Sequence, residues 1–139
     1  MNRLIYIMIL AVFSSVSYAH SEKKLALVIG NSEYGKSNYL QNPVHDAEDV
    51  ASKLEILGFD VIKMTDGTLR EMHEFVSDFG EKAKSYDVAL FYYSGHGLQT
   101  KGENYLMPID GKFNGFNEFF SFVLSNLPNY TSNLVFSIV

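Results

Sequence analysis

The stretch Val88-Ala-Leu-Phe-Tyr-Tyr-Ser-Gly-His-Gly97 decides how this chain folds. Its first six residues are apolar or aromatic, which is typical of a strand buried on both faces of a parallel sheet. His96 follows almost at once, between Gly95 and Gly97. In parallel sheets, functional residues gather outside the carboxyl ends of the strands. The stretch therefore predicts a buried strand with a histidine at its functional end.

Further elements are predicted upstream of this strand. Leu25–Ile29 is a short, fully apolar run, and Phe59–Met64 contains the pair Val61-Ile62, so both segments favour strands. Between and after them, apolar residues recur at helical spacing in two stripes. The first stripe is Val44, Ala47, Val50, Ala51, Leu54 and Leu57; the second is Leu69, Met72, Phe75, Val76, Phe79 and Ala83.

Local signals mark where the two helices begin and end. We expect Asn42 to be the N-cap of the first helix, Pro43 its first helical residue and Gly58 its stop. A capping box, Thr68-x-x-Glu71, is expected to open the second helix. The order strand, helix, strand, helix, strand predicts an α/β fold with a parallel sheet covered on both faces.

After the histidine, Gly97 to Asp110 is expected to form an extended excursion that turns at Lys101-Gly102. Tyr105–Met107 would be its return arm, and Pro108 would stop it. At the end of the chain, Leu134–Val139 is a further apolar run that predicts a strand.

Composition narrows the classes of function. The chain has 139 residues, 47% of them apolar and 19% charged, which indicates one globular domain. A net charge of -5 without a basic stripe argues against nucleic acid as the main partner. Absence of cysteine from the sequence excludes disulfides, thiolate metal sites and a cysteine nucleophile within these residues. We expect no cofactor and no metal, because no dinucleotide fingerprint and no zinc-type histidine spacing occur.

The first 19 residues have the pattern of a signal peptide. A basic start at Met1–Arg3 is followed by the ten apolar residues Leu4–Phe13, and Ser17 and Ala19 fit the small-x-small cleavage pattern. Ten residues fall short of the roughly 20 that a membrane-spanning helix needs. We therefore expect cleavage after Ala19, export to the periplasm or the extracellular space, and no membrane association afterwards.

His96 and Gly97 are the candidate catalytic residues. An imidazole at a strand end can act as acid or base near neutral pH, and the N–H of a flanking glycine can face a developing oxyanion. Taken alone, a histidine between glycines is more often a turn residue with a satisfied hydrogen bond. The chemistry therefore depends on the surrounding sequence.

That surrounding sequence resembles the caspase and metacaspase-like peptidase family. The resemblance is carried, in the family's order, by Leu25-Ala-Leu-Val-Ile-Gly-Asn31, Asn42-Pro-x-x-Asp46-Ala47, Leu57-Gly-Phe59, Asp87-Val-Ala-Leu-Phe-Tyr-Tyr-Ser-Gly-His-Gly97 and Glu103-Asn-Tyr-Leu-Met-Pro-Ile-Asp110. It implies a caspase-like three-layer α/β sandwich that hydrolyses peptide or protein substrates with a Cys–His pair. It also implies that His96 is the catalytic histidine, that the Gly97 N–H contributes to the oxyanion hole, and that a cysteine on the next strand is the nucleophile.

The chain departs from the family at that cysteine. In caspases the cysteine lies about 50 residues after the histidine, which here means about position 146, and the sequence given ends at Val139. We therefore expect residues 24–139 to be an incomplete caspase-like domain that stops short of its nucleophile. Residues 111–139, with five Asn, six Phe and only Lys112 and Glu118 charged, could alternatively be a frameshifted tail.

Three functions stay open on the sequence alone. The first is a caspase-like cysteine endopeptidase domain that is truncated and inactive as written. The second is a pseudo-peptidase that binds a peptide or protein without cutting it. The third is the non-functional product of a broken gene.

Overall fold

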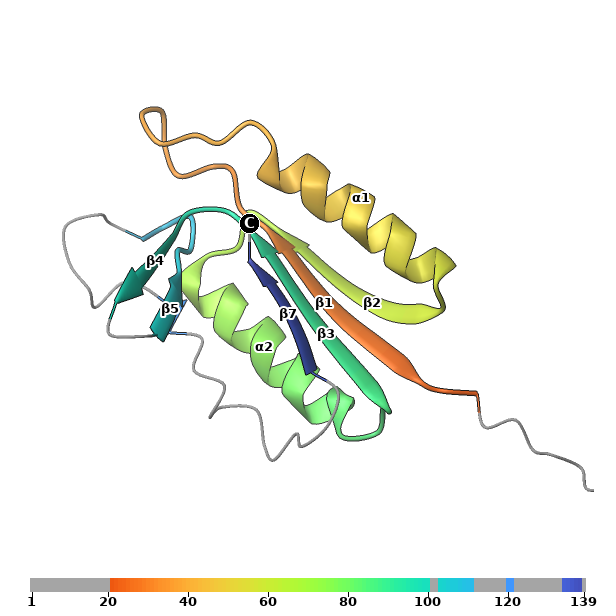
Figure 1. Cartoon of the computed structure of the whole chain (residues 1–139). Helices are drawn as coiled ribbons and strands as arrows, with labels where there is room; N and C mark the ends of the chain where they lie inside the picture. The colour runs from red at the N-terminus through yellow and green to blue at the C-terminus, as the bar shows by residue number, and fades with distance from the viewer. Residues whose placement is uncertain (1–20, 101–102, 112–119, 122–133, 139) are drawn as a thin grey trace, which may run out of the picture.

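The computed structural model describes residues 21–100, 103–111, 120–121 and 134–138 (Figure 1). The expected signal peptide, residues 1–19, lies outside the described residues, as does the expected turn at Lys101-Gly102. The main sheet has four parallel strands in the order β2-β1-β3-β7. They are β1 (Lys24–Gly30), β2 (Phe59–Thr65), β3 (Val88–Ser94) and β7 (Leu134–Ile138).

Helix α1 (Pro43–Ile56) covers one face of this sheet, and α2 (Leu69–Ala83) covers the other (Figure 1). Side chains of a strand alternate between the two faces, so β1 contributes to two cores. Ala26 and Val28 pack in the cluster that holds Ala47 and Ala51 of α1. The α2-side cluster holds Leu25, Leu27, Ile29, Met72, Val76, Phe79 and Phe91. The fully apolar strands of the sequence thus fill two cores, which confirms the α/β fold with a covered parallel sheet.

Both helices begin at the expected N-cap residues, but the side chain of Asn42 does not cap α1. Thr68 and Glu71 form the expected capping box at the start of α2. Asn42 is the N-cap residue of α1, but its side chain makes no capping hydrogen bond. Its backbone angles, φ -101° and ψ -29°, lie in the helical region, whereas a capping side chain needs an extended backbone. Ser32 Oγ, from the loop after β1, instead accepts from the Val44 N–H at 3.4 Å.

A second, small antiparallel sheet stands beside the carboxyl end of the main sheet (Figure 1). It contains β4 (Gly97–Thr100), β5 (Glu103–Leu106) and β6 (Phe120–Ser121). The β4–β5 pair is the expected excursion after the histidine. Strand β7 confirms the expected C-terminal strand over Leu134–Ile138, and it pairs with β3 in parallel, Tyr93 opposite Ile138.

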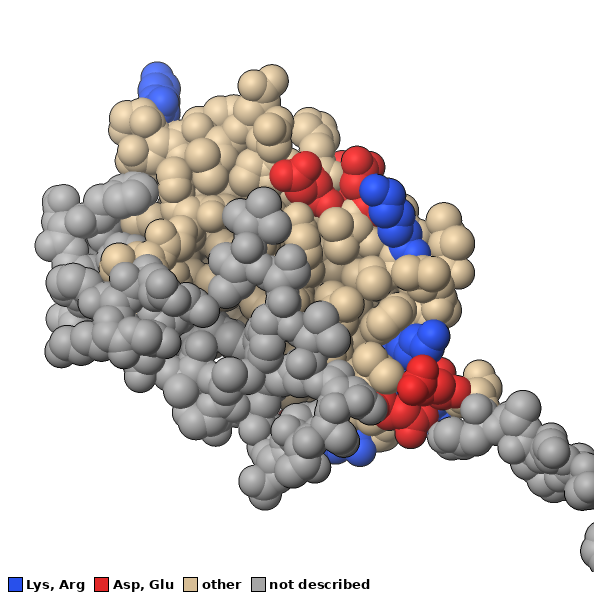
Figure 2. All heavy atoms as spheres, viewed as in Figure 1, with Lys and Arg blue, Asp and Glu red and all other residues tan. Residues whose placement is uncertain are grey.

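In the part of the chain that the structure describes, none of the helices could span a lipid bilayer. On the face that Figure 2 shows, the described charged side chains are few and of both signs.

Candidate active site

His96 lies in the turn between β3 and β4, at the carboxyl end of the main sheet. The segment from Tyr92 to Gly97 is a strand end and a turn, and the His96 side chain is half-buried. Its ring packs against the ring of Tyr34, with centroids 4.6 Å apart and planes inclined by 59°. Tyr34 belongs to the β1–α1 loop (residues 31–42), so this loop forms one wall of the site.

The same loop fixes the direction of the imidazole. His96 Nε2 lies 3.0 Å from the carbonyl oxygen of Asn38. Because a carbonyl can only accept, Nε2 carries the proton when this bond forms. In the neutral ring the basic lone pair then belongs to Nδ1. The β1–α1 loop thereby selects the tautomer as well as the orientation of the ring.

Two buried tyrosine hydroxyls hold the main chain of His96. The His96 N–H donates to Tyr34 Oη at 3.0 Å. The His96 carbonyl accepts from Tyr93 Oη at 2.8 Å and from the Met107 N–H at 3.0 Å. Both polar groups of this residue's backbone are therefore bound.

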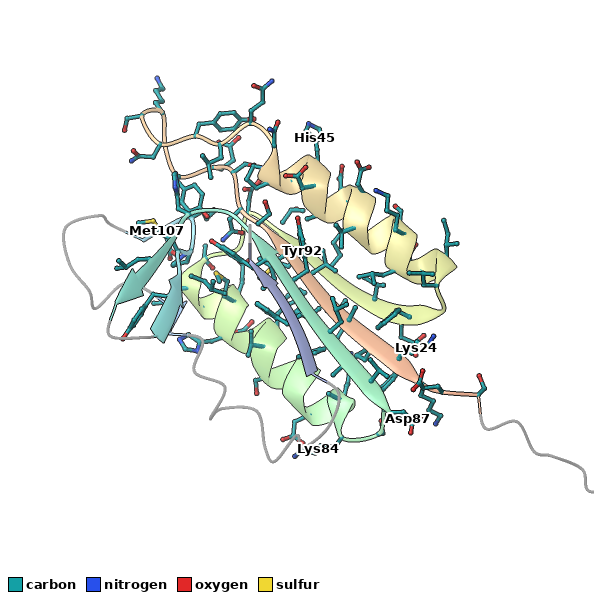
Figure 3. The ribbon with its side chains drawn as sticks, viewed as in Figure 1. Lys24, His45, Lys84, Asp87, Tyr92 and Met107 are labelled. Carbon is teal, nitrogen blue, oxygen red and sulfur yellow. The ribbon has the colours of Figure 1, made fainter. Side chains whose placement is uncertain are left out.

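The Met107 carbonyl lies at the centre of this network, just after β5 and beside the β1–α1 loop (Figure 3). Tyr34 Oη lies 3.1 Å from it, Tyr93 Oη 2.9 Å and Asn31 Nδ2 3.1 Å. The two hydroxyls are 2.9 Å apart. Desolvation by burial raises the pKa of Tyr34 and, more strongly, the pKa of Tyr93. Both phenols therefore keep their protons and can donate.

Polar side chains just after β1 and β2 tie neighbouring loops to this centre. Asn31, fully buried, accepts from the Gly67 N–H at 2.9 Å through Oδ1. Asp66 accepts from the N–H groups of Ser32 and Glu33 at 2.7 and 3.0 Å. These bonds join the start of the β1–α1 loop to the loop between β2 and α2.

The two residues that flank His96 are glycines, and a side chain at either position would come close to neighbouring atoms. A Cβ on Gly95 would lie 2.5 Å from Tyr34 Oη and 2.6 Å from Tyr93 Oη. A Cβ on Gly97 would lie 3.3 Å from the Tyr105 carbonyl. Gly97 pairs with Leu106, next to the hydrogen-bonded pair of His96 and Met107. Antiparallel pairs alternate, so the polar backbone groups of Gly97 point away from β5.

Comparison with known proteins supplies the family. The family model described as "Caspase domain" matches residues 23–136. This chain belongs to the caspase domain family. The match spans most of the chain, from the start of β1 into β7, and includes the whole site just described.

Relatives of this caspase domain are much longer proteins. The human mucosa-associated lymphoid tissue lymphoma translocation protein 1 is 32% identical over 90 residues, covering 65% of this chain and 11% of its own length. Metacaspase-1 of Lodderomyces elongisporus is 29% identical over 119 residues, covering 68% of this chain and 26% of its own. Metacaspase-1 of Botryotinia fuckeliana is 34% identical over 95 residues, covering 57% and 22%. This caspase domain thus spans about a quarter or less of these relatives.

Sequence reasoning located His96 and Gly97 but missed the residues that hold them. From the sequence, Tyr93 is expected only as part of a buried strand, and no role is predicted for Tyr34 or Asn31. The available signal was a polar Asn31 two positions after the apolar run Leu25–Ile29, since a buried strand end needs its polar groups bound. Among the described residues, no three or more His, Asp or Glu side chains come together in a group that could hold a metal ion.

Proposed function

We propose that this chain supplies the histidine side of a caspase-type Cys–His peptidase site. One observation carries the proposal: His96 stands at the carboxyl end of β3 with Nε2 bound to the Asn38 carbonyl. This bond leaves Nδ1 as the basic atom of the neutral ring, which is what a general base needs. The fold around it belongs to the caspase domain family.

In the proposed reaction, the thiol of a cysteine gives its proton to His96 Nδ1, and the thiolate attacks the carbonyl carbon of the scissile peptide bond. The Gly97 N–H, turned away from β5, donates to the oxyanion that forms. His96 then returns the proton to the leaving amine, and water hydrolyses the acyl intermediate. The substrate class is therefore a peptide or a protein.

The position of β7 supports a nucleophile from the adjoining strand. Parallel pairing of Tyr93 with Ile138 brings the carboxyl ends of β3 and β7 to the same edge of the sheet. A cysteine placed shortly after β7 would stand beside the turn that carries His96. No cysteine occurs in the sequence. We therefore propose that the 139-residue chain itself does not cleave peptides by this route.

The experiment has two arms. In the first, the purified chain and its His96→Ala variant are assayed with reporter peptides ending in Arg, Lys or Asp. We expect equal, background rates, because removing the nucleophile of a catalytic unit removes most of its catalysis. Hydrolysis by the chain that disappears in His96→Ala but persists in His45→Ala, an exposed histidine of α1, would contradict the proposed inactivity.

In the second arm, the chain is extended by the codons downstream of position 139, in whichever frame encodes an Asp-Ala-Cys-type motif. We expect cleavage that requires both His96 and the new cysteine. An extended, folded chain that binds these peptides without cutting them would favour the pseudo-peptidase alternative instead.

A further inference from the structure

His96 and Met107 form a pair one residue beyond the Gly97–Leu106 end of the β4–β5 ladder, and this pair is built in an unusual way. In a hydrogen-bonded antiparallel pair, two residues exchange both of their N–H···O bonds. Here the Met107 N–H donates to the His96 carbonyl directly, at 3.0 Å. In the reciprocal position, the His96 N–H donates to Tyr34 Oη at 3.0 Å, and Tyr34 Oη lies 3.1 Å from the Met107 carbonyl. A phenol hydroxyl thus stands between the two peptide groups.

We infer that Tyr34 is a positioning residue for His96: the Tyr34 hydroxyl acts as a spacer that holds the His96 peptide group away from the Met107 carbonyl. The inference rests on the proposed function, since it concerns the base of that reaction. The Tyr34 hydroxyl fixes the position of the His96 main chain, and the Asn38 carbonyl fixes the position of Nε2 at the far side of the ring. Tyr34 and Asn38 belong to the same loop, so one loop holds both ends of the residue.

The distances allow more than one arrangement of the hydroxyl protons, since either tyrosine could donate to the other, and the spacer corresponds to one of these arrangements. Tyr34 accepts from the His96 N–H and donates to the Met107 carbonyl, while Tyr93 donates to the His96 carbonyl. Asn31 supplies a second donor to the Met107 carbonyl, which has two lone pairs. Each polar group of this buried network then has a partner.

Burial makes the spacer specific to a tyrosine. Tyr34 is 7% exposed and Tyr93 is 0% exposed, so no bulk water replaces a lost hydroxyl easily. The Tyr34 ring also contacts the imidazole, at 4.6 Å between centroids. A phenylalanine at position 34 would keep this ring contact and remove only the hydroxyl. It would remove the acceptor of the His96 N–H, so the His96 main chain would be held less firmly and the imidazole would no longer be kept in place against Asn38.

The test is NMR spectroscopy of the ¹⁵N-labelled full chain and its Tyr34→Phe variant. In the parent chain we expect a slowly exchanging His96 amide and ring signals of the Nε2–H tautomer. In Tyr34→Phe we expect the His96 amide to exchange about five- to tenfold faster, the factor of one lost hydrogen bond, and the ring signals to shift towards a mixture of tautomers. Tyr39→Phe, a 53% exposed tyrosine of the same loop, is the matched control and should change neither.

Unchanged His96 amide and ring signals in a folded Tyr34→Phe chain would overturn the inference. So would a change of equal size in Tyr39→Phe. Should Tyr34→Phe not fold, the parent chain decides: a cross-peak between a slowly exchanging tyrosine hydroxyl proton and the His96 amide supports the spacer, and its absence overturns it. None of these readouts needs peptide cleavage. The spacer can therefore fail while His96 still serves as the base, and the proposed peptidase role can fail while the spacer stands.

Discussion

At the scale of single residues, the hydroxyls of Tyr34 and Tyr93 leave no space for a side chain at Gly95, next to His96. A side chain at this position would meet the hydroxyls of Tyr34 and Tyr93. We expect Gly95→Ala to lower the free energy of unfolding by about 1–3 kcal/mol, the usual cost of overpacking a filled core. Denaturant unfolding monitored by circular dichroism measures this cost.

The double variant Tyr34→Phe/Gly95→Ala separates the steric clash between the new Cβ and the Tyr34 hydroxyl from any other effect of an alanine at position 95. Removing the Tyr34 hydroxyl removes one of the atoms that the new Cβ would meet, so the added cost of Gly95→Ala should be smaller in this background. An equal cost in both backgrounds would show that the hydroxyl is not what excludes a side chain at position 95.

At the scale of elements, the start of α2 couples stability to pH. Glu71 accepts from the Thr68 side chain and N–H, and these bonds hold the pKa of the Glu71 carboxyl below its usual value. A depressed pKa in the folded state adds stability above the unfolded-state pKa, and this stability is lost as the pH falls through the folded-state pKa. We expect Glu71→Gln to be less stable than the parent chain at pH 7 and to match it well below about pH 4.

Chemical unfolding at a series of pH values makes this comparison, with Asp78→Asn, an exposed carboxylate later in α2, as the control. A Glu71→Gln deficit that persists at low pH would show that the charge is not responsible. Thr68→Ala should cost about 1 kcal/mol at neutral pH, since it removes the N-cap itself.

The same elements show what could be predicted from the sequence. Strands β1 and β3 and helix α2 were recognisable because period, capping and apolar runs are local properties of the chain. The network around His96 was not, because its partners come from distant segments: Tyr34 and Tyr93 are 59 residues apart, and Asn31 and Met107 are 76 apart. Nothing within a local window pairs such residues. They meet because β1 and β3 are adjacent parallel strands whose carboxyl ends share one edge.

At the scale of the whole molecule, that shared edge joins the site to both cores. There the loop after β1 bonds to the loop after β2 through Asn31 and Asp66, and to β3 and its following turn through Tyr34. At the opposite end of the sheet, the Asp87 side chain accepts from the Lys23 N–H at 2.8 Å, which joins the start of β3 to the start of β1 (Figure 3). Loss of either core should therefore disturb the site as well.

We accordingly expect the chain from His20 to Val139 to unfold in one cooperative transition. Helices α1 and α2 each cover one face of the same central strands, so neither layer can melt without exposing β1. Far-ultraviolet circular dichroism and tyrosine fluorescence should give coincident curves. Leu27→Ala, which empties part of the α2-side core, should lower the free energy of unfolding by about 2–5 kcal/mol without splitting the transition. Transitions that differ between the two probes would mean that the sheet does not form as one unit, which is the outcome expected of a broken gene product.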